Sequence, residues 1–290
     1  SSDLALLVCV TAPAMPAAAQ DRAPSAAATA EELFIVNTAT GSHQNQARIA
    51  HFSNGNYVVI WKSVDDATND SGTLRAQLFD QYGNRLGGEF TVESHGGGMQ
   101  LNPNIAVLAD DSFVVTWQTE DSGFYGATST IAAQRFSATG TAIGSEFAVN
   151  SAASSFPTAP AITALSNGSY VVSWDDFLNH AVRAQVFAAN GTRIGNELVV
   201  GTYPGLSATS LTVQALANGG FVAAWNALDG SGQGVRAQLF TSTGTEVISR
   251  QKTPTLGAAN TGPLVGPVSL AEVFYHPASF GSYDNTLDEF

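Results

Sequence analysis

The chain has 290 residues with 24 acidic and 11 basic side chains, a net charge of −13 and a sequence pI near 4.5. Charged residues make up 12% of the chain, about half the share in an average soluble domain. Lysine occurs only as Lys62 and Lys252, which excludes the clustered basic surface that nucleic acid or an anionic membrane would need.

The N-terminus resembles a secretory signal peptide. Residues 4–10 are apolar, and small residues ending in Ala19-Gln20 follow, as in an h-region and its cleavage site. We therefore expect residues 1–20 to be a truncated signal peptide whose removal also removes Cys9, and 21–30 to be a flexible lead-in. The alternative is a short apolar N-terminal helix or tail. Later runs fall short of the ~20 apolar residues of a membrane span, so we expect a secreted, periplasmic or cell-surface protein.

An internal repeat organises residues 31–249. Each unit has an apolar strand ending in Trp, then Ala-Gln-x-Phe, and then a glycine. The Trp residues recur at intervals of about 50 to 57 residues, which chance does not produce. The repeat units span about 32–88, 89–145, 146–196 and 197–249. The repeated Trp positions are Trp61, Trp117, Trp174 and Trp225, and the repeated Gln positions are Gln77, Gln134, Gln185 and Gln238.

Each unit contains four strand signals separated by turn residues. In the second unit the signals are 104–108, 112–117, 131–136 and 146–150, and Asp110-Asp111 lies between the first two. The other units place Asn-Gly at that turn, and both pairs tolerate the positive φ angles of tight hairpins. Short strands without helical periodicity predict an all-β fold.

The strand that ends in Trp is apolar on both faces, which indicates that other sheets cover both sides. Four strands in about fifty residues, stacked face to face on their neighbours, are typical of a β-propeller of four-stranded blades. Tandem β-sandwich repeats are the alternative. Four blades are clear, and a fifth blade or an incomplete ring stays open.

The two ends of the repeat region bear on closure. Residues 32–37 match the outer strand at 146–150, and in a closed propeller they would complete the last blade. Residues 250–290 contain no Trp and no Ala-Gln-x-Phe. They are interpreted as a degenerate or truncated further repeat, with a first strand at 263–273.

These motifs resemble the repeats of large secreted bacterial proteins that often also carry RTX-type calcium modules or adhesin domains. The resemblance covers roughly residues 32–249 and rests on the Glu-Phe-x-Val-Asn, Phe-Val-Val-x-Trp and Ala-Gln-x-Phe patterns. It implies a secreted or cell-surface setting. The Gly-Gly-x-Gly-x-Asp nonapeptide of RTX modules does not occur in the chain, so the resemblance implies no calcium binding.

Acidic residues gather after each Trp. Calcium takes six to eight oxygen ligands, and the segment after Trp61 supplies several carboxylate and amide oxygens. The tentative calcium ligands are Asp65, Asp66, Asn69, Asp70 and Asp229. The alternative is a solvated acidic turn that keeps sheet edges from pairing, also for Glu120-Asp121 and Asp175-Asp176. Calcium is the only cofactor that the sequence indicates.

The repeated Trp and Gln residues have two interpretations each. A large aromatic residue at the end of a buried strand is most simply core between adjacent blades, and the alternative is an exposed ring that stacks on sugars. The Gln side chains are expected to form hydrogen bonds within or between blades. Their other possible role is contact with a ligand.

No catalytic motif is present: the five His residues have no metal-ligand spacing, and there is no phosphate loop or nucleophile elbow. We therefore expect no enzyme but a secreted binding or adhesion module whose partner is a glycan or a surface protein. A structural spacer within a large adhesin is the second hypothesis. A loop-borne hydrolase or lyase site is the third.

Overall fold

A computed structural model describes residues 33–38, 43–64, 72–94, 98–120, 129–151, 156–204, 208–228 and 232–247. The chain separates into two compact units, Ser1–Ile35 and Val36–Phe290. Of the first unit only residues 33–35 are described, and their side chains are exposed. No helix in the described ranges is long and apolar enough to cross a membrane.

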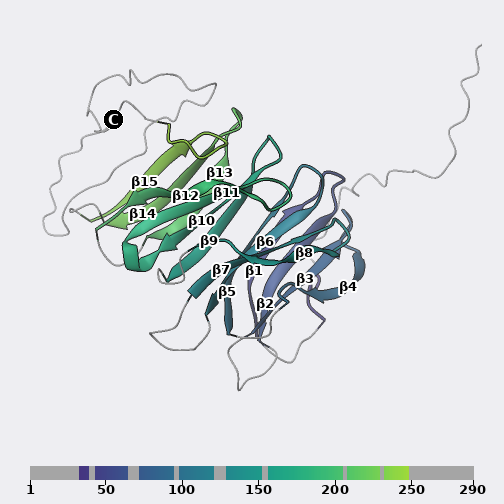
Figure 1. The fold of residues 1–290 in the computed structure, drawn as a ribbon. Helices are drawn as coiled ribbons and strands as arrows, with labels where there is room; N and C mark the ends of the chain where they lie inside the picture. Colours follow the sequence, from purple (N-terminus) through teal and green to yellow (C-terminus); the bar gives the residue numbers. More distant parts are fainter. Residues whose placement is uncertain are drawn as a thin grey trace, which may run out of the picture. The chain divides into compact units, whose positions relative to one another are not determined.

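The second unit contains four antiparallel sheets that follow one another along the chain (Figure 1). Each sheet has its strands in sequence order, and the last sheet has three described strands instead of four. The first sheet contains β1 (His43–His51), β2 (Tyr57–Val64), β3 (Thr73–Phe79) and β4 (Arg85–Thr91). The second contains β5 (Met99–Val107), β6 (Phe113–Glu120), β7 (Ser129–Phe136) and β8 (Ala142–Ala148). The third contains β9 (Pro157–Ala164), β10 (Tyr170–Asp176), β11 (Ala181–Phe187) and β12 (Arg193–Thr202), and the short 3₁₀ helix η1 (Phe177–Asn179) connects β10 to β11. The last contains β13 (Thr209–Ala215), β14 (Phe221–Leu228) and β15 (Gln233–Phe240).

Successive sheets pack face to face. One apolar cluster joins Ile60 and Leu74 of the first sheet to Trp117 of the second. A second cluster joins the second sheet to the third, and another joins the third to the last. The first strands β1, β5, β9 and β13 contact one another in turn, whereas β4 and β8 are largely exposed. This arrangement of inner and outer strands confirms the predicted propeller blades.

The hairpin between the first two strands of each sheet forms as the turn residues predict. Gly55, Gly168 and Gly219 have positive φ angles, and Asp111 adopts φ 58° where the other turns have glycine. Next to each hairpin an aromatic pair stacks across the second and third strands, for example Phe113 on Phe136 with ring centroids 5.1 Å apart. The turns and these cross-strand pairs set the register of each sheet.

The outer strands begin earlier than predicted. In the second unit the structure has Ala142–Ala148 instead of 146–150, because a bulge at Gly144, with φ 71°, lets the strand pair directly after its turn. Gln134 stabilises this bulge: its Nε2 atom donates to the carbonyls of Arg135 at 2.8 Å and of Ile143 at 3.3 Å. Gln77 and Gln185 form the same bonds in their sheets, which confirms the expected structural role.

The predicted strand at 32–37 is not formed: residues 33–38 have no strand pairing. Val36 packs beside Trp61 and Phe79 of the first sheet, and the Thr38 backbone N–H donates to Glu89. In the other units the equivalent residues pair with the third strand of their own sheet. Residues 36–38 instead contact the first sheet, where Arg85 of β4 donates to the Val36 carbonyl at 3.0 Å.

Candidate functional site

The two ends of the sheets differ in polarity. The tight hairpin turns lie at one end of the sheets. At the other end, which we call the loop end, β2 ends and β3 begins, and the second and third strands of the other sheets end and begin there too. Most of the buried polar and charged side chains lie at the loop end. They are Lys62, Ser63, Glu93, Gln100, Gln118, Ser129, Asn150, Asp175 and Asp176. Buried polar groups are costly unless they are paired, so the loop end is where a function is to be sought.

Glu93 follows β4 and departs from the repeat. Its Oε2 atom accepts the backbone N–H of Leu74 at 2.9 Å, just as Oδ1 of Asn150 accepts that of Ile131 at 2.8 Å in the second sheet. An acid therefore replaces the amide of the equivalent position. Glu93 is 8% exposed, and burial, together with the negative charge of Glu146, raises its pKa to about 7. At neutral pH this carboxyl is about half protonated.

Glu146 of β8 is the second acid of this site. Its Oε2 atom accepts the backbone N–H and the hydroxyl of Ser94, both at 2.9 Å. Glu89 and Glu197 accept the backbone N–H groups of Thr38 and Ser151 in the same way. Glu146 thus belongs to a repeated link between neighbouring sheets, and Glu93 adds a second carboxyl to that link.

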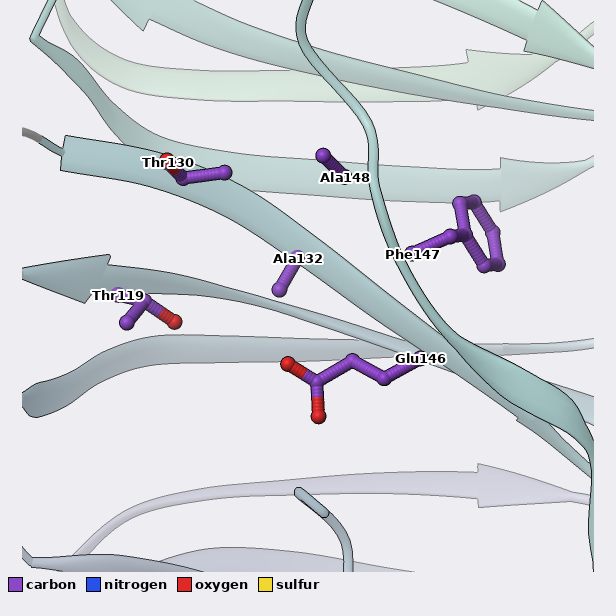
Figure 2. Close-up of a pocket in the computed structure, with 6 residues that line it drawn as sticks. All are labelled: Thr119, Thr130, Ala132, Glu146, Phe147 and Ala148. Atoms are coloured by element: carbon purple, nitrogen blue, oxygen red, sulfur yellow. The ribbon is translucent and has the colours of Figure 1, made fainter. Parts of the chain in front are cut away.

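A hollow of about 170 Å³ lies beside Glu146. It is lined by Thr119, Thr130, Ala132, Glu146, Phe147 and Ala148. Figure 2 shows the Glu146 carboxylate turned toward the side of the hollow where Thr119 and Ala132 lie. The volume admits several waters or one small polar group, so a group bound there would meet a carboxylate directly.

A second pair of acids lies at the loop end of the third sheet. The sequence places Asp175 and Asp176 in a loop, but the structure places both in β10, because the strand continues past Trp174 and pairs with β11. Asp175 is 1% exposed and accepts the hydroxyl of Tyr203. Burial raises the pKa of Asp175 to about 6.

Asp176 is fully buried and forms an ion pair with Arg183, with 2.5 Å between Oδ2 and Nε. The amide of Asn179 donates to both of its carboxylate oxygens, at 3.0 and 2.9 Å. These partners offset the cost of burying the Asp176 charge. The Asp175–Asp176 pair is therefore explained by contacts within the protein.

The predicted calcium ligands lie outside the described residues. This holds for Asp65, Asp66, Asn69, Asp70 and Asp229, and the calcium hypothesis stays a prediction. Within the described ranges no three His, Cys, Asp or Glu side chains are grouped so that they could hold a metal ion.

The four Trp residues are core residues. Trp117 and Trp174 are fully buried, and Trp61 and Trp225 are 3% and 4% exposed. Trp117, Trp174 and Trp225 are core between neighbouring sheets, and Trp61 is covered by Val36 and its own sheet. The interpretation as core is confirmed, and stacking of these rings on sugars is wrong, because the rings are covered.

Sequence reasoning missed Glu93 and Tyr203. A signal for Glu93 is present, because Val36-Asn37, Val92-Glu93 and Val149-Asn150 occupy one column of the repeat and only Glu93 is acidic there. No comparable signal exists for Tyr203, whose partner Asp175 is identified only by the fold.

No protein-family model matches the chain, and a search of curated proteins finds no match. Among solved structures, an endo-arabinase from Bacteroides thetaiotaomicron is 14% identical, with a TM-score of 0.45 over 70% of this chain and 78% of that protein. An α-L-arabinofuranosidase from Fusarium graminearum in complex with an iminosugar inhibitor is 10% identical, with a TM-score of 0.46 over 69% and 58%. A thermostable family-43 glycoside hydrolase is 12% identical, with a TM-score of 0.45 over 75% and 77%.

Two expectations are corrected by this comparison. The chain was expected to be a binding or adhesion module or a spacer, and not to be an enzyme. The matched structures are instead an endo-arabinase, an α-L-arabinofuranosidase and a family-43 glycoside hydrolase, and neither expectation stands. Identities of 10 to 14% do not assign an activity or a substrate to this chain.

Proposed function

We propose that this chain is a glycan-processing hydrolase whose acid and base are Glu93 and Glu146. The observation that carries the proposal is a buried carboxyl with a pKa of about 7 placed near a second carboxylate that borders a hollow. Glycoside hydrolysis uses two carboxyl groups, one protonated and one ionised.

Glu93 is the proton donor in this proposal. Its carboxyl stays partly protonated at pH 7 because burial disfavours the charged form. It would protonate the glycosidic oxygen of the leaving group as the bond to the anomeric carbon breaks. Glu146 would act from the hollow, either on a water molecule or on the anomeric carbon itself, depending on its separation from Glu93.

The acids of the third sheet are less suited to this chemistry. Asp175 also has a raised pKa, but Tyr203 occupies one of its oxygens and its side chain is buried. Asp176 is engaged by Arg183 and Asn179.

Neither acid of the third sheet lines the hollow beside Glu146. Glu93 does not line the hollow either, but the charge that acts on it is that of Glu146, which does. The charges that act on Asp175 are those of Asp176 and His180.

The test is the release of reducing sugar from a panel of aryl glycosides and polysaccharides, arabinan included, by the full chain. Glu93→Gln and Glu146→Gln are expected to lower kcat about 100-fold or more, the size of a general acid–base contribution. Glu197→Gln is the matched control, because Glu197 forms the equivalent link to Ser151 in another sheet. Absence of release from every substrate would contradict the proposal, as would an unchanged rate in Glu93→Gln.

We also propose that the protein acts outside the cytoplasm. The support is the signal-like segment 1–20 and the resemblance of the repeats to those of secreted bacterial proteins. Fusion of residues 1–30 to a reporter enzyme that is active only after export tests this location. A reporter that stays inactive inside the cell would contradict it.

A further inference from the structure

The first and last described sheets each have an exposed face whose equivalent is buried in the other sheets. Ile49 of β1 is 65% exposed, and Val235 of β15 is 55% exposed. Ile49 pairs with the residue two before Trp61, and Val235 lies two residues before its Ala-Gln pair. The residues at the same positions in the other sheets are all buried. They are Ile105, Ile162 and Val213 for the Ile49 position, and Leu74, Ile131 and Val182 for the Val235 position.

The three interfaces between the described sheets are built in one way. The residue at the Val235 position of one sheet lies in a single apolar cluster with the Ile49-position residue and the Trp of the next sheet. These groups are Leu74, Ile105 and Trp117, then Ile131, Ile162 and Trp174, and then Val182, Val213 and Trp225. Each sheet thus packs on the next sheet through its Val235 position, and it contacts the previous sheet through its Ile49 position.

The exposed face of the first sheet, which we call the front face, carries further contacts of such an interface. Val36 packs beside Trp61 on this face. In the other interfaces, a valine at the end of the previous sheet's outer strand lies in one cluster with the Trp. Those valines are Val92, Val149 and Val200. The Thr38 backbone N–H also donates to Glu89, which is the link that joins neighbouring sheets elsewhere. The front face therefore has the contacts of a face that receives a preceding sheet.

The exposed face of the last sheet, which we call the rear face, is apolar. Val235, Ala237 and Leu239 alternate along β15 and share this face. Val222 of β14 pairs with Leu239 and adds to it. Apolar faces of this kind mark sites of association, because contact of apolar side chains with water is unfavourable. The rear face presents the Val235 position of the repeated interface, and the front face presents its Ile49 position.

We infer that copies of this chain associate end to end, with the rear face of one copy packed on the front face of the next. Among the described sheets, the rear face alone has an exposed Val235 position and the front face alone has an exposed Ile49 position. Both faces are exposed in one chain at the same time, and a second copy supplies to each face the half of the interface that it lacks. The contact joins two different surfaces, so it builds a row or a ring of copies instead of a two-fold dimer.

The mass of the full chain in solution tests the inference, because every contact needs one front face and one rear face. Sedimentation of the parent at rising concentration should show species of two or more copies, whose share increases. Ile49→Arg and Val235→Arg each place a charge in every contact, and both variants are expected to stay at the mass of one chain, 30.0 kDa. Val199→Arg is the matched control and should associate like the parent, because Val199 is 54% exposed but lies in the third sheet.

A mixture of Ile49→Arg and Val235→Arg decides whether the contact is front to rear. The first variant keeps its rear face and the second keeps its front face, so the mixture is expected to form pairs and nothing larger. A parent that stays at one copy at every concentration overturns the inference, and so does a mixture that forms no pairs. Association that persists in either single variant would come from another surface, and it overturns the inference as well.

A disulfide between copies checks the contact directly. In a Cys9→Ser background, chains with Ile49→Cys are mixed with chains with Val235→Cys under mild oxidation. Their mixed disulfide is expected to form at least tenfold faster than the one between Ile49→Cys and Val199→Cys chains, and equal rates overturn the inference. Circular dichroism confirms that each variant is folded, and glycan hydrolysis plays no part in either readout.

Discussion

Glu93 takes in the first sheet the place that Asn150 takes in the second: each side-chain oxygen accepts the backbone N–H at the start of the third strand, from Leu74 and Ile131 respectively. The amide of Asn150 accepts this hydrogen bond at every pH, because an amide does not titrate. The carboxyl of Glu93 performs it with a pKa raised to about 7, mainly by burial. The exchange adds a titrating acid to a position that is occupied by an amide in the second sheet.

The stability of the protein is expected to depend on pH through Glu93. Its pKa is about 7 in the folded chain against 4.5 for the free side chain. The stabilisation is fully present below about pH 4.5 and is lost as the pH rises through 7. The loss is on the order of 3 kcal/mol for a shift of this size. Urea unfolding at pH 5 and pH 8 measures it.

Glu93→Asn restores the amide of the repeat and is the matched variant for that measurement. We expect it to remove most of the pH dependence and to make the protein more stable than the parent at pH 8. Glycan hydrolysis would be lost in the same variant, a trade of activity for stability. A parent and variant with the same pH dependence would show that Glu93 ionises freely.

Tyr203 and Asp175 are expected to be energetically coupled. The Tyr203 hydroxyl is a donor to a carboxylate that is 1% exposed, and this bond lowers the pKa of Asp175 against the larger effect of burial. Tyr203→Phe should cost about 1–3 kcal/mol at pH 8 and raise the pKa of Asp175 further. A double-mutant cycle with Asp175→Asn measures the coupling, and additive effects would contradict it.

The repeated Gln residues are expected to differ in their contribution to stability. Gln134→Leu leaves the carbonyls of Arg135, Ile143 and Gly144 without their donor, at a cost of about 1–3 kcal/mol. Gln238→Leu is the control, because Gln238 is less buried and makes longer bonds of 3.3 and 3.4 Å. Thermal unfolding should show a larger loss for Gln134→Leu, and equal losses would refute the bulge-stabilising role.

The neighbouring Gly87 and Gly88 isolate the cost of backbone strain, because a side chain would meet no steric contact at either position. A Cβ atom at either position meets no atom within 4 Å, but only Gly87 has a positive φ, 72°. Gly87→Ala should therefore cost about 1–2 kcal/mol, whereas Gly88→Ala should be neutral or slightly stabilising. Chemical unfolding of the two variants distinguishes them, and equal stabilities would argue against the left-handed bulge.

Much of the fold could be predicted because its signals are local and repeated. The Trp register, the Asn-Gly turns and the two-faced apolar strands defined the blades, and each sheet pairs strands that are adjacent in the chain. The outer strands were placed too late because the Gly144 bulge depends on the side chain of Gln134, which reaches it from the neighbouring strand. A bond of that kind has no periodic signature.

The sequence by itself determined the repeat, the all-β class and the hairpins, and it favoured burial of the Trp residues. Only the tertiary structure decided that Asp175 and Asp176 belong to a strand, that Glu93 is a buried acid near Glu146, and that Val235 faces outward. The physical reason is desolvation: the pKa of a carboxyl depends on how much water the neighbouring sheet removes. The residues that approach Glu93, such as Glu146, are distant in the chain, and only the folded arrangement brings them near.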